Sequence, residues 1–400
     1  MSTGAVGIDL GTTFSAIAHV NQHGVPEILP NAEGDRITPS VILFEDDDVI
    51  VGNYAKQAAV VYPEQVVEFV KRHMGDGTYN FSYRGKDYDP EQLSSYILAK
   101  LKHDAELRLG HRVDQAVITV PAYFNDIQRR ATMRAGELAG LKVLKLINEP
   151  TAAAFAYGLN NAGKNIRVMV YDLGGGTFDV TLVDIEGTEI NVVGTDGDHK
   201  LGGKDWDDRL IEHVAEAFRE KHGIDPLEEL SSYHDLRQKC VSAKISLTRR
   251  PKVNVFHDYG SKVLRLAVTR ETFEELTADL LQRTHDLTLS VLKEANAAQE
   301  SIDVVLLDLT MPDMSGTRAF AQMREIRPGV PGLFASGYRA QEVSDELADT
   351  VIYLDLLAFR LGIDLGAAVG DKFNRTSQRV DSSVRIGARG CWRTSDAARM

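Results

Sequence analysis

Two similar glycine-rich stretches decide the fold of this chain: AVGIDLGTTFSAI at residues 5–17 and VMVYDLGGGTFDVTLV at residues 168–183. In each, an apolar run leads into Asp-Leu-Gly, then small residues with threonine, then a second, alternating apolar run. This order predicts two β-hairpins with glycine turns. Glycine lets an anion approach the backbone N–H groups, so each turn can hold a phosphate. Two copies about 160 residues apart predict duplicated lobes that grip one polyphosphate in a cleft.

Polar side chains within these stretches strengthen the prediction of a phosphate site. Threonine hydroxyls can donate hydrogen bonds, and Asp9 and Asp172 can hold a magnesium ion through its water ligands. Taken alone, either aspartate could be an ordinary turn residue. It is their repetition that favours the phosphate site.

The stretches between the hairpins predict further α/β units. Residues 116–141, AVITVPAYFNDIQRRATMRAGELAGL, predict a buried strand, a turn and an amphipathic helix. Residues 146–159, LINEPTAAAFAYGL, predict a strand that enters a helix, with Glu149 at its start. The acidic run at residues 45–48 lies between two apolar runs and predicts a solvated hairpin turn.

Composition and charge exclude several classes of protein. The 400 residues are 43% hydrophobic, enough for two or three cores, and the net charge of -13 is spread along the chain, which argues against a nucleic-acid surface. Cys240 and Cys391 are the only cysteines, too few for a disulfide framework or a zinc site. The chain shows no signal-peptide pattern at its start and no apolar run of about 20 residues. We therefore expect a cytoplasmic protein that is neither exported nor inserted in a membrane.

Seven motifs in order carry a resemblance to a known family: IDLGTT, NAEGDRITPS, VKRHMG, VITVPAYFND, INEPTAAAFAYG, YDLGGGTFD and LGGKDWD. Together, from about residue 5 to about residue 305, they resemble the nucleotide-binding domain of the seventy-kilodalton heat-shock chaperones of the DnaK type. The resemblance implies the two-lobed α/β ATPase fold of actin and hexokinase. It places lobe I at residues 1–165 and an incomplete lobe II at residues 166–302.

The resemblance also implies roles for individual residues, with ATP or ADP, Mg²⁺ and K⁺ as cofactors. The positions implied to hold the nucleotide phosphates are Gly11, Thr12, Thr13, Gly174, Gly175 and Gly176, with Gly202 and Gly203 of LGGKDWD also in the nucleotide site. The implied catalytic positions are Lys71, which reaches the γ-phosphate, Glu149, which orients the attacking water, Asp172 and Thr177. Asp9 and Asp172 match the carboxylates around the metal ions, and Pro121 and Arg129 match the pair that relays the nucleotide state.

Each of these positions also has a plainer interpretation. Lys71 could be a solvated helix residue, and Glu149 could be a carboxylate that favours a helix N-terminus through the helix dipole. Only the ordered set of motifs outweighs these alternatives.

The adenosine half of the site departs from the family pattern. In CVSAKISLT, residues 240–248, Lys244 and Thr248 match the family, but Val241 stands where the family has a glutamate that bonds the ribose. The family's GGSxRMP loop, whose arginine stacks on adenine, is replaced by DLTMPDMSG after the apolar VVLL. A lost hydrogen bond and a lost stacking cation together cost about 3 kcal/mol, or about a hundredfold in affinity.

Two segments after residue 302 resemble other families. Residues 303–343 resemble a βαβ fragment of a response-regulator receiver domain, with Asp308 at the phosphoacceptor position and Ser336 at the hydroxyl position. The receiver's acidic pair is absent, and the only lysine after Ser336 is Lys372, outside any matching motif. A buried parallel strand such as VVLL suits the chaperone domain and the receiver domain equally, because it carries no family-specific polar residues.

Residues 344–386 resemble the C-terminal helices of MazG-type nucleotide pyrophosphohydrolases. Glu346 and Asp349 match half of that family's metal motif, the other half (EExxE) is absent, and two carboxylates alone are usually a solvated helix face. Residues 387–400 form a tail without periodicity.

The sequence therefore predicts a chaperone-type ATPase domain with an impaired adenosine site and weak ATP hydrolysis at best. Its expected partners are the nucleotide and the family's co-chaperones or exchange factors, without nucleic acid, membrane or a peptide-substrate site. One alternative is a composite chain, fused, designed or mis-assembled, with no activity. Another is phosphoacceptor signalling at Asp308.

Overall fold

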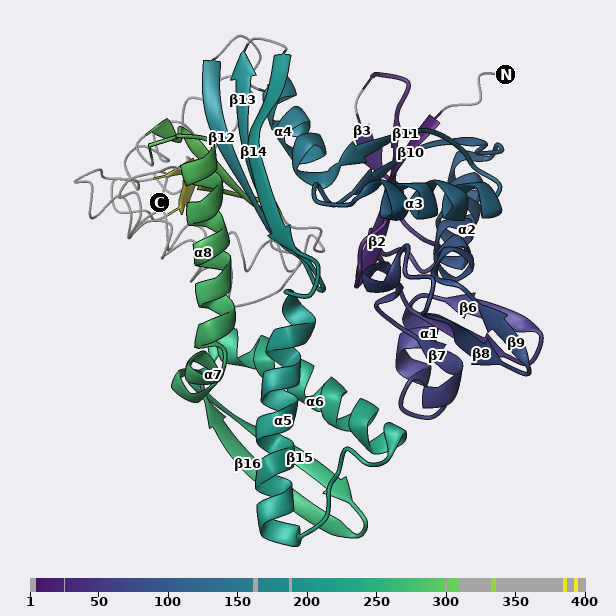
Figure 1. Cartoon of the computed structure of the whole chain (residues 1–400), viewed down its shortest axis with the longest axis vertical. Coiled ribbons are helices and arrows are strands. Elements are labelled where there is room, and N and C mark those ends of the chain that lie inside the picture. The colour runs from purple at the N-terminus through teal and green to yellow at the C-terminus, as the bar shows by residue number, and fades with distance from the viewer. Residues whose placement is uncertain are drawn as a thin grey trace. The chain divides into compact units, whose positions relative to one another are not determined.

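The computed structural model describes residues 5–24, 26–160, 165–186, 189–298, 301–308, 332–335, 384–386 and 392–394. The chain divides into two compact units, Met1–Gly337 and Tyr338–Met400. In the second unit, the described residues are two short antiparallel strands, β19 (Val384–Ile386) and β20 (Trp392–Thr394). The first unit carries every other described element (Figure 1).

The first sheet is built on the first glycine hairpin. Its strands are β1 (Ala5–Asp9), β2 (Phe14–Val20), β3 (Pro26–Ile28), β10 (Gln115–Val120) and β11 (Lys142–Asn148), and the short β4 (Thr38–Pro39) also pairs with β2. They follow the order β11-β10-β1-β2-β3, in which β1 pairs antiparallel with β2 and parallel with β10. The part of the chain built on this sheet is called the first lobe below.

The second sheet is built on the second glycine hairpin. Its strands are β12 (Asn165–Leu173), β13 (Phe178–Glu186), β14 (Glu189–Asp198), β17 (Val304–Asp308) and β18 (Gly332–Ala335). They follow the order β14-β13-β12-β17-β18, with β12 antiparallel to β13 and parallel to β17. The part of the chain built on this sheet is the second lobe.

The two sheets share one topology: three antiparallel strands are followed by two parallel ones. Both predicted glycine hairpins are therefore confirmed. The VVLL strand is also confirmed as a buried parallel strand, because Val304, Val305 and Leu306 are buried within β17. In the second sheet, β17 and β18 take the places that β10 and β11 take in the first.

Helices and small sheets complete the first lobe. Asp89 and Asn125 each form a capping box, which starts α2 (Pro90–Leu109) and α3 (Asp126–Leu138) and supplies the orphan N–H groups of each first turn with partners. The predicted strand–turn–helix and strand–helix units are confirmed by β10 with α3 and by β11 with α4 (Glu149–Asn160). The remaining elements are β5 (Ile42–Glu45), β6 (Asp48–Val51), α1 (Asn53–Ala58), η1 (Pro63–Gln65), β7 (Val66–Val67), η2 (Val70–His73), β8 (Phe81–Tyr83) and β9 (Lys86–Tyr88). The acidic run forms the turn between β5 and β6, as predicted.

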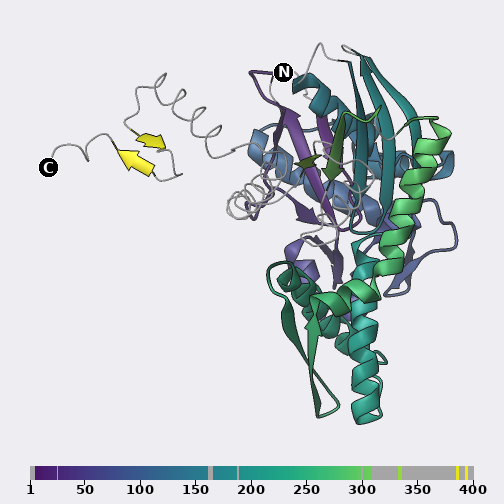
Figure 2. The same cartoon turned by 90° about the vertical axis from the view of Figure 1, so that its left-hand side faces the viewer.

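Two hydrophobic layers cover the second sheet, one on each face. Met169 and Tyr171 of β12 pack with residues of α8 (Ala278–Glu294), whereas Val168 and Val170 pack with Ala154 of α4. This alternation follows the two-residue period of a strand. The other elements of the second lobe are α5 (Gly203–His222), α6 (Leu230–Arg249), α7 (Arg270–Leu276) and the hairpin of β15 (Lys252–Tyr259) and β16 (Lys262–Thr269). Figure 2 shows this hairpin beside α5. Among the described residues, no helix is long and apolar enough to cross a membrane.

Candidate functional site

A cavity of about 240 Å³ lies where the two glycine turns meet. The residues that line it are Asp9, Gly11, Thr12, Thr13, Phe14, Lys71, Thr119, Glu149, Ala152, Ala153, Val170, Asp172, Gly174, Gly175 and Thr177. The structure therefore gathers most of the predicted phosphate, metal and catalytic positions around one space. They come from both hairpins, from η2 and from the start of α4.

The two glycine turns touch each other, and this contact requires glycine. A Cβ on Gly175 would lie 1.8 Å from Thr13 Oγ1, and a Cβ on Gly176 would lie 2.3 Å from Thr12 Cγ2. Close approach of the Thr12 and Thr13 side chains, rather than an unusual backbone angle, thus explains why these positions hold glycine.

Gly202 and Gly203 support the second turn from outside the cavity. Gly203 N donates to Gly174 O at 3.0 Å, and Lys204 N donates to Gly175 O at 2.9 Å. A Cβ on Gly202 would lie 2.5 Å from backbone atoms of Gly176. The N-terminus of α5 is thereby fixed to the turn.

Lys71 forms a buried ion pair with Glu149. Its Nζ lies 2.7 Å from Glu149 Oε1, and the two side chains are 7% and 13% exposed. Burial by itself lowers the pKa of Lys71. The carboxylates of Glu149, Asp9 and Asp172 together raise this pKa by more than burial lowers it, so the net shift is upward. The plainer interpretation of Lys71 as a solvated residue is wrong, because its side chain is buried and paired with Glu149. Burial also raises the pKa of Glu149, against the lowering effect of Lys71.

The cavity fits a magnesium ion that is bound together with phosphates. Asp9 accepts a hydrogen bond from Thr119 Oγ1 at 2.8 Å, is exposed, and lines the cavity together with Asp172. Within the described part of the chain, no group of three or more His, Cys, Asp or Glu residues is arranged to hold a metal by itself. Mg²⁺ commonly binds through one or two carboxylates, waters and substrate phosphates. The buried Thr13 Oγ1, which has no hydrogen-bond partner among the described residues, suits a phosphate oxygen.

Two further residues contact the surroundings of the cavity without lining it, and the sequence analysis did not select them. Asp179 is 1% exposed, and its Oδ1 accepts a hydrogen bond from Ala122 N at 3.1 Å. Burial, followed by the Glu149 carboxylate, raises the pKa of Asp179 well above its ordinary value. Arg72 donates from Nε to Gly176 O at 2.8 Å. The second aspartate of YDLGGGTFD and the arginine after Lys71 in VKRHMG were visible signals, but only the fold shows what they contact.

The predicted adenosine positions do not line this cavity. Lys244 is buried and pairs with Asp207 at 2.7 Å. Thr248 Oγ1 donates to Ile245 O of its own helix at 2.6 Å. Val241 is partly buried on the same helix, α6.

The relay pair lies at the edge of the site. Pro121 directly follows β10. Arg129 donates to Phe124 O and to Asn148 Oδ1, each at 2.8 Å. Arg129 therefore ties α3 to the residue that precedes Glu149, while its role as a relay stays a prediction.

The residues predicted for other chemistries are mostly beyond the described part of the chain. Asp308 ends β17 and is the register partner of Asp172. Ser336, Glu346 and Asp349 lie outside the described residues. The receiver-like and MazG-like interpretations stay predictions.

Two matching sheets, with a cavity of about 240 Å³ where their glycine turns meet, define this part of the chain as a two-lobed α/β nucleotide-binding domain. A family model described as "Hsp70 protein" matches residues 5–308. The chain belongs to the Hsp70 family.

Relatives from bacteria and archaea agree with this assignment. "Chaperone protein DnaK" of Thermotoga petrophila is 46% identical over 310 residues, which cover 76% of this chain and 52% of that protein. "Chaperone protein DnaK" of Halobacterium salinarum is 40% identical over 392 residues, which cover 95% of this chain and 62% of that protein. The chain spans between about half and two thirds of these relatives. The second alignment extends well beyond residue 308, into the part with the receiver-like and MazG-like predictions.

Proposed function

We propose that this chain binds ADP and ATP with Mg²⁺ in the cavity between its lobes and hydrolyses ATP slowly, as the ATPase domain of a DnaK-type chaperone. One observation carries the proposal: the buried Lys71–Glu149 pair lines the same 240 Å³ cavity as both glycine turns. A fixed positive charge and backbone N–H groups at one place suit phosphoryl transfer, which depends mainly on positioning and charge neutralisation.

The chain's own residues divide the work between them. The N–H groups of the two turns, with Thr13 and Thr177, hold the phosphates. Lys71 places its charge at the terminal phosphate, and the Glu149 carboxylate, besides holding Lys71, orients a water for attack. Asp9 and Asp172 would hold Mg²⁺, which would offset phosphate charge when bound with the nucleotide.

We further propose that adenosine is held weakly. Val241 offers no carboxylate to the ribose, and DLTMPDMSG offers no stacking arginine. Phosphate contacts would then supply most of the binding free energy, with an affinity about a hundredfold below that of a complete site. Docking of co-chaperones or exchange factors, and a cytoplasmic location, remain part of the proposal at the level of the family.

Calorimetric titration with ADP and Mg²⁺ tests the proposal against the alternative of a composite chain without activity. We expect measurable Mg²⁺-dependent binding that Lys71→Ala and Thr177→Ala each reduce sharply. Lys262→Ala, at an exposed position on β16, is the matched control and should bind as the parent does. Binding that is unchanged in Lys71→Ala and Thr177→Ala, or no heat up to about 1 mM ligand, would favour the alternative.

A further inference from the structure

The segment that precedes Lys71 reaches across to the second lobe through a strained residue. Phe69, which caps η2, has φ 59° and ψ 25°, in the left-handed region. For a bulky residue this conformation is a true outlier, and it persists only where the surroundings impose it. Lys71 follows two residues later, so whatever holds Phe69 also fixes the backbone that carries Lys71.

An ion pair between the lobes holds this segment on one side. Arg237 of α6 donates to both carboxylate oxygens of Glu68, with Nη2 at 2.9 Å from Oε1 and a still closer contact from Nη1 to Oε2. The Glu68 and Arg237 side chains are only 11% and 15% exposed. Bidentate, charge-assisted pairs of this kind are strong and directional.

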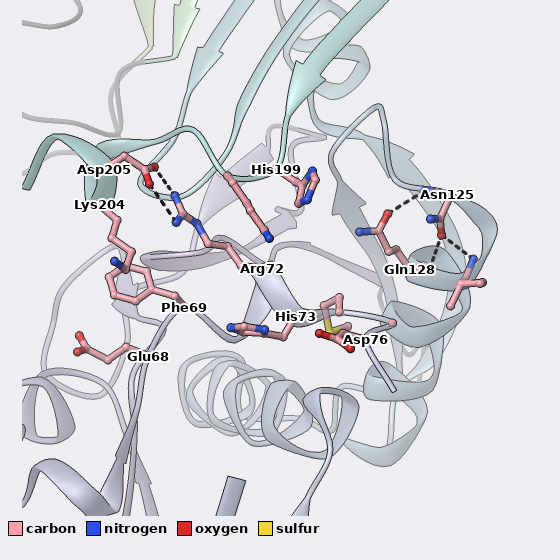
Figure 3. A pocket seen from close by; sticks show the side chains of 14 residues that line it. Glu68, Phe69, Arg72, His73, Asp76, Asn125, Gln128, His199, Lys204 and Asp205 are labelled. Carbon is pink, nitrogen blue, oxygen red and sulfur yellow. Dashed lines mark hydrogen bonds and ion pairs between the residues drawn. The ribbon is translucent and has the colours of Figure 1, made fainter. Parts of the chain in front are cut away.

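The ring of Phe69 lies between two cations of the second lobe. Arg237 Cζ is 4.9 Å and Lys204 Nζ is 5.6 Å from the ring centroid, within the range of cation–π attraction. Figure 3 shows Glu68 and Phe69 beside Lys204 at one end of a neighbouring cavity of about 570 Å³.

On its other side, the segment is fixed by Arg72. Besides its bond to Gly176 O, Arg72 donates to Asp205 Oδ2 at 2.5 Å, and the same oxygen accepts from Gly202 N at 2.8 Å (Figure 3). Contacts with the second lobe thus bracket Lys71 on both sides.

We propose that Glu68, Phe69 and Arg237 are positioning residues, which hold Lys71 in its reactive place only while the two lobes are together. The inference rests on the proposed function. Without the Glu68–Arg237 pair, the left-handed Phe69 loses the bidentate contact beside it, and the backbone relaxes and shifts Lys71. The rate of ATP hydrolysis thereby depends on closure of the lobes. Loss of the Glu68–Arg237 pair leaves the contacts of ADP with the glycine turns in place.

Single variants and a reversed pair test this role in the full chain. Glu68→Gln and Arg237→Gln should each lower the single-turnover rate of ATP hydrolysis about ten- to hundredfold, as expected for a displaced reacting group. The dissociation constant of ADP should change less than about threefold, because it depends on the turns. Glu68→Arg combined with Arg237→Glu should recover most of the rate. Arg209→Gln, which breaks an exposed ion pair with Asp279 inside the second lobe, is the control.

Amide hydrogen exchange of residues 69–74 in the nucleotide-free protein gives a readout that does not need catalysis. Exchange should be faster in both single variants and normal in the reversed pair and in Arg209→Gln, with melting temperatures recorded to confirm folding. If exchange and rate match the parent in both single variants, or if the reversed pair behaves like the single variants, the inference is wrong. If the parent binds no ADP, the proposed function fails, and exchange alone decides whether the pair holds the Lys71 segment.

Discussion

Gly175→Ala offers the sharpest test of the contact between the two glycine turns. The added Cβ would lie 1.8 Å from Thr13 Oγ1 and 2.7 Å from Thr13 Cβ, and the three nearest atoms all belong to the Thr13 side chain. To restore an ordinary contact near 3.4 Å, the turns must separate by about 1.6 Å. The φ angle of Gly175 lies outside the left-handed region, so alanine adds a clash without backbone strain.

Such a separation affects binding more than folding. Phosphate oxygens held from both sides would lose about one charge-assisted hydrogen bond, worth about 1.5–3 kcal/mol. We therefore expect the affinity for ADP with Mg²⁺ to fall about ten- to hundredfold. The melting temperature should stay close to that of the parent, because the lobes can part without disturbing either core.

Titration calorimetry on three variants measures this effect. Gly7→Ala is the matched control, since a Cβ there has no atom within 4 Å, and it should bind ADP normally. Gly175→Ala combined with Thr13→Gly removes the clash together with the Thr13 hydroxyl, so it should recover only part of the affinity that Gly175→Ala loses. If Gly175→Ala binds ADP within about threefold of the parent, the contact between the turns is not required and the reasoning is refuted.

Four further predictions follow from single residues and their charges. Val241→Glu should restore a ribose acceptor and tighten ADP binding by about 0.5–1.5 kcal/mol in calorimetry; no gain would contradict the impaired adenosine site. Burial and the Glu149 carboxylate raise the pKa of Asp179 in the folded protein. Ionising Asp179 therefore costs stability once the pH rises above 3.8, the pKa of this group in the unfolded chain. Asp179→Asn should raise the melting temperature more at about pH 8 than at about pH 5. Asp184→Asn should do the reverse: hydrogen bonds from Arg167 lower the pKa of Asp184, so the variant is less stable than the parent at neutral pH and this deficit shrinks as the pH falls below about 4. Asp308→Gly removes a negative charge from the register partner of Asp172 and should tighten binding of ADP by about two- to tenfold at low salt, whereas equal affinity would mean that this charge does not reach the phosphates.

Local patterns were enough to predict both glycine hairpins and the two α/β units between them. Alternating apolar residues around Asp-Leu-Gly specify the hairpins, because periodicity and turn chemistry act over a few neighbouring residues. The capping box of Asn125 and Gln128 at the start of α3 is another local signal, but the sequence analysis did not use it. The ordered motifs also selected many of the residues that line one cavity, although Gly176, Gly202, Gly203, Lys244 and Thr248, selected with them, do not line it. Those that line it include Glu149 and Lys71, which are 78 residues apart in the chain.

The contacts between distant residues were decided by the tertiary structure alone. No local pattern states that Thr13 fills the space beside Gly175, that Asp179 is buried near Glu149, or that Arg237 draws Glu68 across to the second lobe. Burial and charge pairing depend on which surfaces the fold brings together, and one apolar strand can serve several folds equally well. The same reason applies to VVLL. Its residues suit a strand of the chaperone domain or of the receiver domain, and only its pairing with β12 makes it the fourth strand of the second sheet.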